Sequence, residues 1–312
     1  HPSLERDETK KCKILLQITR HCRNCPHLPP HSYIGTNVQR AQGALKTELK
    51  SLIFDVDGTL ADTEEVHRQA FNQAFSEFGL DWNWSPKLYT QLLETSGGRE
   101  RMRKYGADLR GDFRSDQAFE AFLRDLHQTK SAIYRDKLTS GHVPLRTGVA
   151  RLIEEARSAG LVLGIATSSS TANLHALLDQ NLASDWRQWF ASVHTCDSVP
   201  DKKPSPAVYA RVLAETGIPA NQSVAFEDTV NGLLACNAIN LPVVITTHYY
   251  TRHHHFPGAA MVCDGLGSVE QPAHCQAECL DDRGLVSLQV LRGLIASRAE
   301  NQPPPPLAQA HA

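Results

Sequence analysis

Four short apolar runs, separated by amphipathic stretches, dominate the pattern of the chain. The runs, which have the length and composition of buried strands, span residues 49–56, 161–167, 223–228 and 241–247. Apolar residues recur at helical spacing around the later runs, over residues 148–160, 170–182, 205–217 and 229–240. Strands that alternate with helices predict an α/β fold with a doubly wound, parallel-sheet, Rossmann-like core.

The connection between the first two strands is too long for an ordinary loop of ~2–6 residues. Most of this connection, residues 57–160, has a helical pattern. We therefore expect an inserted α-helical cap domain at 66–140 and a core domain formed by 46–65 and 141–285. An insertion that begins directly after a candidate site loop is placed to act as a lid. A C-terminal helix and a Pro-rich tail are expected at 286–312.

The first 45 residues differ from the rest because they are basic, mixed and without clear periodicity. This pattern predicts a disordered N-terminal extension; a transit peptide has only weak support. His21, Cys22, Cys25 and His27 have a spacing compatible with metal binding, so a zinc-stabilised binding module at 21–27 is an alternative. No second ligand pair follows at finger spacing, which favours the disordered extension.

Composition limits the function further. The chain of 312 residues has a formal net charge of −2, which gives no electrostatic reason to expect nucleic acid or an anionic membrane as a partner. No apolar run approaches the ~20 residues of a membrane span. The 8 cysteines are scattered, so a reducing, cytoplasmic setting is expected, or a plastid in a photosynthetic eukaryote. The oligomeric state is open, and a monomer is plausible.

Polar residues that could carry out chemistry lie at the ends of three predicted strands and at one turn. Asp55 and Asp57 point to the same face of the chain and repel each other unless a cation or a shared proton compensates them. The other polar groups are the hydroxyls of 167–170, the lysines at 202–203 and the acids at 227–228. Each could instead be a helix cap or a solvated loop residue. Together, at successive strand ends, they supply a hard-cation site, an anion cradle and a neutralising lysine, as phosphoryl transfer requires.

The order of these groups also resembles that of a known family. The stretches "DVDGT", "ATSSS", "KKPSP" and "FEDTVNG" resemble the four motifs of haloacid-dehalogenase-like phosphatases with a helical cap. The stretches "GTLADTEEVHRQAFNQAF", "SGGRERM", "PLRTGVARLIEEAR" and "YYTRHHHFPGA" are similar to the CbbY group, the xylulose-1,5-bisphosphate phosphatases of carbon-fixing organisms. The resemblance implies a Mg²⁺-dependent sugar-bisphosphate phosphatase of the Calvin cycle that removes an inhibitor of the CO₂-fixing carboxylase. A β-phosphoglucomutase-like mutase and a broader sugar-phosphate phosphatase are the alternatives.

The same resemblance implies roles for individual residues. Asp55 would be the nucleophile that forms an aspartyl phosphate, and Asp57 the general acid and base. Thr167 and Ser168 would bind the transferring phosphate beside Lys203, and Ser169 would reach the substrate. The implied Mg²⁺ ligands are Asp55, Asp57 through its backbone carbonyl, and Asp228, with Glu227 assisting.

Substrate specificity is expected from the cap. Asp62 and His67 lie near the expected hinge, and Tyr89, Gly98 and Arg99 belong to the cap. We expect Arg99 to hold a second phosphate, since adjacent glycines allow a ligand to approach closely. The alternative is a solvated helix face that Arg99 shares with Arg101 and Arg103. His248 and the histidines at 253–255 are expected in a surface loop, with a metal-binding tract as the minor alternative.

Overall fold

The computed structural model describes residues 48–110, 117–277 and 279–301. The predicted N-terminal extension, the alternative zinc module at 21–27 and the Pro-rich tail lie outside the described residues. Within the described ranges, no helix is both long and apolar enough to cross a membrane.

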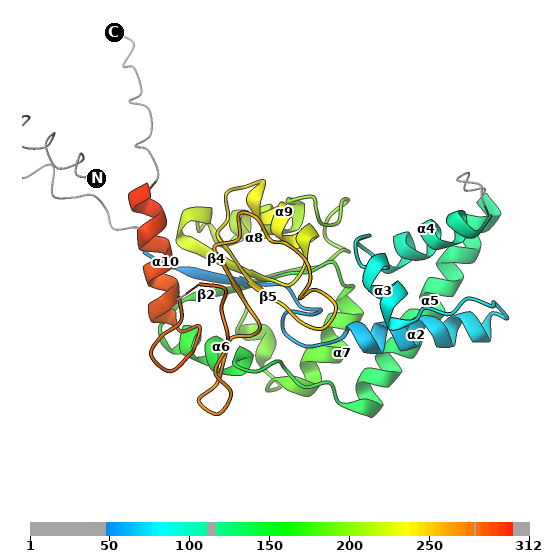
Figure 1. The fold of residues 1–312 in the computed structure, drawn as a ribbon, viewed down its shortest axis with the longest axis horizontal. Coiled ribbons are helices and arrows are strands. Elements are labelled where there is room, and N and C mark those ends of the chain that lie inside the picture. The colour runs from blue at the N-terminus through cyan, green and yellow to red at the C-terminus, as the bar shows by residue number, and fades with distance from the viewer. Residues whose placement is uncertain (1–47, 111–116, 278, 302–312) are drawn as a thin grey trace, which may run out of the picture. The chain divides into compact units, whose positions relative to one another are not determined.

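A parallel sheet of six strands forms the centre of the core (Figure 1). Its strand order is β3-β2-β1-β4-β5-β6, so the chain winds from β1 to one edge and returns through β4 to the other. The strands are β1 (Ser51–Phe54), β2 (Val162–Ala166), β3 (Ser192–His194), β4 (Ser223–Glu227), β5 (Val243–Thr246) and β6 (Met261–Cys263). The doubly wound parallel fold is therefore confirmed, and β1 and β4 flank its topological switch point.

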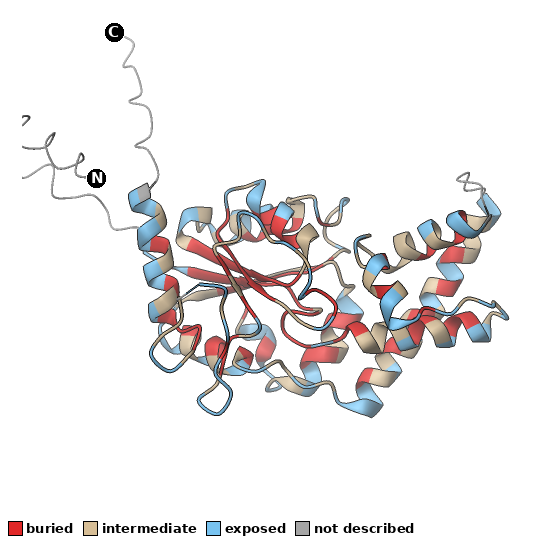
Figure 2. Cartoon of the chain, viewed as in Figure 1, coloured by how far each residue is buried: buried red, intermediate tan, exposed pale blue. Residues whose placement is uncertain are grey.

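Helices cover both faces of this sheet, and the pleat of β1 shows how the two layers are separated. Leu52 and Phe54 belong to one hydrophobic cluster, whereas Ile53 belongs to the other, as side-chain alternation requires. The first cluster includes residues of α6 (Val149–Ser158), α7 (Thr171–Asn181) and α10 (Leu288–Asn301). The second includes residues of α8 (Ala207–Thr216) and α9 (Val230–Asn237). Figure 2 shows that the strands between these layers are almost entirely buried.

Of the five helices between β1 and β2, the first four form a separate helical layer (Figure 1). They are α2 (Glu64–Glu77), α3 (Pro86–Leu92), α4 (Gly98–Arg110) and α5 (Gln117–Gly141). These helices have their own aromatic cluster, in which the Phe71 and Trp84 ring centroids lie 4.6 Å apart. We call this layer the cap. Its limits at residues 66 and 140 stay a prediction, as do the other domain boundaries.

Two edge strands were not predicted from the sequence. Both β3 and β6 have three residues, and each pairs with the sheet on one side only. Such short segments carry too little apolar alternation to be recognised. The parallel arrangement places the carboxyl ends of β1, β2 and β4 at one edge, and these ends hold the candidate site.

Candidate active site

Three buried carboxylates meet where β1 and β4 end. Asp55 directly follows β1, and Glu227 and Asp228 close β4. One oxygen of each side chain lies within 4.8 Å of the others. Burial raises the pKa of both Asp55 and Asp228, and the neighbouring carboxylates raise it further. Such a set of oxygens, far from water, suits a hard divalent cation.

Lys203 supplies a fixed positive charge to this group. Its Nζ atom lies 2.6 Å from Asp55 Oδ1, 2.5 Å from Glu227 Oε1 and 2.9 Å from the Ala166 carbonyl oxygen, and the residue is 4% exposed. Burial opposes the charge, but the two carboxylates raise the pKa of Lys203 above its ordinary value. Lys203 is therefore a permanent cation that balances part of the negative charge.

Glu227 has hydrogen-bond donors at both of its oxygens. Oε1 accepts from Lys203 and, at 2.6 Å, from the hydroxyl of Tyr209. Oε2 accepts from the Asp228 amide at 3.2 Å and the Thr229 hydroxyl at 3.4 Å. This pattern fits a residue that positions Lys203 and Asp228. Asp55 and Asp228 have fewer donors and are the better candidates for direct metal binding.

The turn after Asp57 requires glycine at position 58. The φ of Gly58, +81°, lies in the left-handed region. A Cβ atom at this position would lie 2.3 Å from Asp228 Oδ2 and 2.8 Å from Glu64 Oε1. The turn after Asp57 therefore brings the backbone close to the acidic group, and only glycine fits it.

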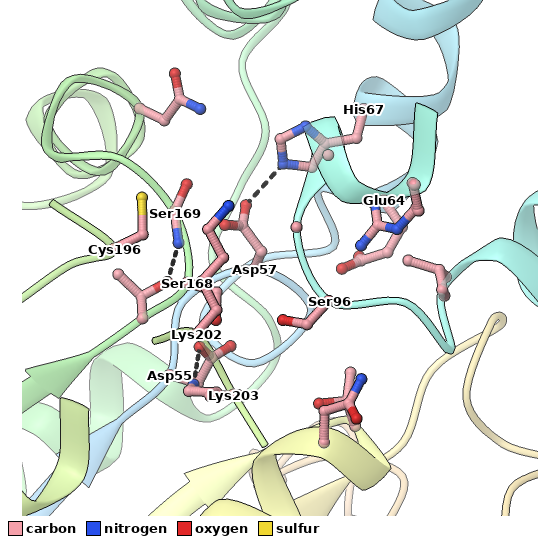
Figure 3. Close-up of a pocket in the computed structure, with 18 of the residues that line it drawn as sticks. Asp55, Asp57, Glu64, His67, Ser96, Ser168, Ser169, Cys196, Lys202 and Lys203 are labelled. Carbon is pink, nitrogen blue, oxygen red and sulfur yellow. Dashed lines mark hydrogen bonds and ion pairs between the residues drawn. The ribbon is translucent and has the colours of Figure 1, made fainter. Parts of the chain in front are cut away.

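Asp57 points toward the cap and accepts three hydrogen bonds at Oδ1. The donors are Thr63 Oγ1 at 2.7 Å, His67 Nε2 at 3.1 Å (Figure 3) and the Tyr134 hydroxyl at 3.2 Å. Burial alone would raise the pKa of Asp57, but the bonds from His67 and Thr63 hold it below its ordinary range. Asp57 is thus ionised in this arrangement, with two of its three donors on cap helices α2 and α5.

A lysine of the cap extends this contact into a chain of three titratable groups. Lys130 Nζ lies 2.5 Å from His67 Nδ1, and the His67 ring stacks on Tyr134 with centroids 3.8 Å apart. Burial and Lys130 lower the pKa of His67 to about 4. Burial and Arg101 lower the pKa of Lys130 to about 7. A neutral His67 that accepts from Lys130 at Nδ1 therefore donates from Nε2 to Asp57.

The hydroxyl segment after β2 lines the same pocket. Thr167 is buried, and its Oγ1 accepts from the Ser169 amide at 3.0 Å. Ser170 caps α7 by accepting from the Asn173 amide at 3.4 Å, so the N-terminal end of this helix borders the pocket. Ser168 Oγ is buried and has no hydrogen-bond partner among the described residues. Figure 3 shows Ser168 and Ser169 beside Asp55 and Asp57. The segment can therefore receive an anion.

The pocket encloses about 160 Å³ between these core residues and the cap. The cap contributes basic and small residues to its lining, namely Gly97, Gly98, Arg101, His127 and Lys130, together with Tyr89 and His67. Arg101 Nη1 donates to the Tyr89 hydroxyl at 3.2 Å. A ligand that carries a second negative group would find cations on this side.

The structure places two of the predicted substrate residues elsewhere. Arg99 is not part of the pocket lining, whereas Arg101 is. Helix α4 begins at Gly98, and a residue three positions later returns to the same helix face, while the next residue is turned away by ~100°. Asp62 is exposed, pairs with Arg146 Nε at 3.1 Å and lines a different pocket beside Tyr249.

His248 lies in the loop after β5, as expected, but its side chain is buried, whereas His253 and His255 are exposed. The side chain of His248 is 5% exposed, and Nε2 lies 3.0 Å from Asp228 Oδ2. Burial lowers the pKa of His248 to about 4, which keeps it neutral. The contact with Asp228 could not be predicted from the sequence, because it joins two segments that are distant along the chain.

Further contacts join the core to the cap around the pocket, besides the hydrogen bonds of His67 and Tyr134 to Asp57. Lys202 Nζ lies 3.0 Å from both carboxylate oxygens of Glu100. In addition, Asn231 Nδ2 donates to the Glu94 carbonyl oxygen at 3.0 Å, and the Tyr250 hydroxyl donates to Glu65 Oε2 at 2.5 Å. The cap is therefore in contact with the core around the pocket.

Comparison with known proteins agrees with this arrangement. Residues 52–246 match the model of the haloacid dehalogenase-like hydrolase family. A plasmid-encoded CbbY protein of Cupriavidus necator is 43% identical over 224 residues, which cover 72% of this chain and 88% of the relative. A crystal structure of a CbbY variant from Rhodobacter sphaeroides, in complex with xylulose 1,5-bisphosphate, is 37% identical with a TM-score of 0.64, and the match covers 70% of this chain and 96% of that one. A β-phosphoglucomutase of Clostridium difficile, 17% identical with a TM-score of 0.59 over 80% of this chain and 98% of that one, shares the fold.

Proposed function

The chain belongs to the haloacid dehalogenase-like hydrolases and, within them, to the CbbY proteins, and from this premise we propose that it is a Mg²⁺-dependent sugar-bisphosphate phosphatase acting on xylulose 1,5-bisphosphate. Its phosphatase class follows from the family. The metal, the aspartyl-phosphate intermediate and the substrate are the parts that we propose.

One observation carries the proposal: the pocket has two chemically different ends. Its core end combines the buried carboxylates, Lys203 and the hydroxyls of 167–170. Its cap end presents Arg101, His127 and Lys130. A molecule with one phosphate to be cleaved and a second to be held matches both ends. The similarity to a CbbY protein solved with xylulose 1,5-bisphosphate supports this choice among bisphosphates.

The residues present fit a magnesium ion. Asp55 and Asp228 would hold it with the backbone carbonyl of Asp57, while Glu227 positions the group from behind. Burial raises the pKa of two of the three carboxylates, Asp55 and Asp228, and the cation that pairs directly with Asp55 and Glu227 is Lys203. When bound, the cation would supply charge neutralisation to the transferring phosphoryl group.

Asp55 is the proposed nucleophile. Its carboxylate attacks phosphorus, the bond from phosphorus to the sugar oxygen breaks, and the phosphoryl group becomes attached to Asp55. Lys203, fixed 2.6 Å from Asp55 Oδ1, and the hydroxyls after β2 stabilise the charge on the phosphoryl oxygens. Water then hydrolyses the aspartyl phosphate and regenerates the carboxylate.

Asp57 is the proposed general acid and base, and its low pKa means that its proton must be supplied. The chain from Lys130 through His67 offers a route: His67 gives its Nε2 proton to Asp57 and takes one at Nδ1 from Lys130. Protonated Asp57 passes the proton to the leaving sugar oxygen. The same carboxylate, ionised again, then removes a proton from the attacking water.

A phosphate-release assay tests the proposal. Xylulose 1,5-bisphosphate, other sugar bisphosphates and sugar monophosphates are compared at equal concentration, with Mg²⁺ and after removal of the metal with a chelator. We expect inorganic phosphate and xylulose 5-phosphate from the first substrate at the highest kcat/KM, and no release without metal. An isomerised sugar phosphate without net phosphate release would instead indicate a mutase.

A further inference from the structure

A second group of reactive side chains lies away from the active-site pocket, at the opposite edge of the sheet from β3. Cys263 ends β6, and Cys275 and Cys279 follow in the segment 264–287, orange in Figure 1, which leads to α10. None of these three cysteines lines the active-site pocket. The proposed function therefore leaves this group without a role.

The backbone holds Cys275 in a fixed position beside β6. Cys263 and Cys275 are partners in an antiparallel bridge. On either side of that bridge, the Asp264 amide donates to the His274 carbonyl oxygen at 3.0 Å, and the Gln276 amide donates to the Val262 carbonyl oxygen at 3.0 Å. Cys275 is thus anchored like a strand residue.

The side chain of Cys279 returns toward this anchored cysteine. The Sγ atoms of Cys275 and Cys279 lie 2.8 Å apart. A disulfide bond is about 2.05 Å long, so the two sulfurs need to approach each other by less than about 1 Å to form one. Both residues are partly exposed, and Cys279 lines a surface pocket of about 450 Å³ between β6 and α10. A small oxidant can therefore reach two sulfurs that already face each other.

We propose that Cys275 and Cys279 are a redox modification site that forms a reversible intramolecular disulfide by exchange with a disulfide oxidant. The Cys275 thiolate attacks one sulfur of the oxidant, breaks its S–S bond and expels one thiol, leaving a mixed disulfide. Cys279 then attacks the Cys275 sulfur and expels the second thiol. Two electrons and two protons pass from the protein dithiol to the oxidant.

The electrostatics of the three cysteines agree with this order of events. A hydrogen bond from Cys263 lowers the pKa of Cys275 to about 6, so Cys275 is the better nucleophile at neutral pH. Burial, together with the charge of Cys275, raises the pKa of Cys279. Once Cys275 is in the mixed disulfide, that charge is gone, and Cys279 ionises more easily for the second step.

A thiolate-bound metal is the competing use of the same sulfurs. Zinc takes four ligands, whereas this group offers three cysteines, and its sulfurs are not among the sets of described donor atoms that lie within 4.8 Å of one another. The 2.8 Å separation is also shorter than two thiolates on one zinc ion require. The disulfide is therefore the better fit.

Peptide mapping by mass spectrometry tests the proposal on the full chain, with Cys12, Cys22 and Cys25 replaced by Ser so that only the described cysteines report. The reduced protein is incubated with glutathione disulfide at neutral pH, alkylated after denaturation and digested. We expect a Cys275–Cys279 link in most molecules, reversed by dithiothreitol, with Cys196, Cys236 and Cys263 alkylated. The Cys196→Ser variant, which removes a partly exposed cysteine elsewhere, should behave identically.

Two further variants separate the steps. Cys279→Ser should accumulate glutathione on Cys275, because no second thiol can displace it, and Cys275→Ser should form no link at all. Both cysteines are partly exposed, so circular dichroism is expected to show intact folds. A Cys263–Cys275 link, a failure of the reduced pair to react, or one zinc ion retained per chain and lost in Cys275→Ser would each overturn the proposal.

Discussion

The core end and the cap end of the pocket are built by different means. At the core end, the carboxylates and hydroxyls lie at the ends of strands of the parallel sheet, Lys203 reaches them from the loop after β3, and buried neighbours such as Tyr209 hold them in place. At the cap end, the lining residues lie on helices α2 to α5 and on the turn before α4, and the cap meets the core through side-chain contacts such as that of Glu100 with Lys202. The difference teaches that a pocket can combine a site on the sheet framework with a lining from a separate helical layer, and we expect the chemistry at the first and substrate recognition at the second.

The largest expected effect is at the core end. Asp55→Asn should reduce turnover by several orders of magnitude, because an amide is not an effective nucleophile toward phosphorus. The fold should persist, since the change preserves the size of the side chain. Phosphate release and the thermal midpoint are measured on the same preparation. Near wild-type turnover would refute the assignment of Asp55.

A pair of adjacent lysines compares the two ends directly. Lys203→Met leaves buried carboxylates without their cation and should cost about 3–5 kcal/mol of unfolding free energy, together with most activity. Lys202→Met removes a half-buried pair with Glu100 at the cap, where about 1 kcal/mol or less is expected. Urea unfolding measures both. Equal destabilisation by the two substitutions would mean that the buried ion pairs of Lys203 stabilise the fold no more than the pair of Lys202 with Glu100.

The third prediction concerns pH and the chain from Lys130 to Asp57. With its pKa at about 7, Lys130 loses its proton as pH rises through neutrality, so kcat should fall on that side. Lys130→Met should lower kcat about a hundredfold and remove this dependence. Lys137→Met, on the same helix but outside the pocket lining, is the matched control. A pH profile unchanged in shape in Lys130→Met would contradict the relay.

The lowered pKa of Lys130 also predicts how the stability of the fold changes with pH. The pKa of Lys130 is lowered from 10.5 to about 7 on folding, so the unfolded chain binds more protons between these values. The cost of burying the charge is fully present below pH about 7 and disappears as pH rises toward about 10.5. Wild type should therefore gain stability relative to Lys130→Met over this range, as urea titrations at several pH values can measure.

The acidic residues at the strand ends could be predicted from the sequence, because they directly adjoin the apolar runs that predict the strands. One apolar run precedes Asp55, and another precedes Glu227 and Asp228. Each run predicts a strand, and the position of the acid after it predicts the edge of the sheet at which the acid lies. The short edge strands β3 and β6 were not predicted, because three residues are too few to show an alternation of apolar and polar side chains. The fold and the core residues were therefore predictable from pattern and motif together.

The cap end could not be read in the same way. The residue at which α4 begins determines which of the arginines at 99, 101 and 103 faces the pocket. The sequence did not define that first residue. Lys130 and Tyr134 meet His67 and Asp57 only after α2 and α5 pack together. His248 is buried by a tertiary contact with Asp228. Contacts between distant segments leave no periodic signal in either segment.

The most direct test of the division of roles is the ratio of kcat/KM for xylulose 1,5-bisphosphate to that for p-nitrophenyl phosphate, measured in wild type, Arg101→Ala and Arg99→Ala. Arg101 lines the cap end, and a charge-assisted contact is worth about 1.5–3 kcal/mol. The ratio should therefore fall about ten- to a hundredfold in Arg101→Ala and stay within about twofold of wild type in Arg99→Ala. Equal losses on both substrates in Arg101→Ala, or a larger change in Arg99→Ala, would contradict the account.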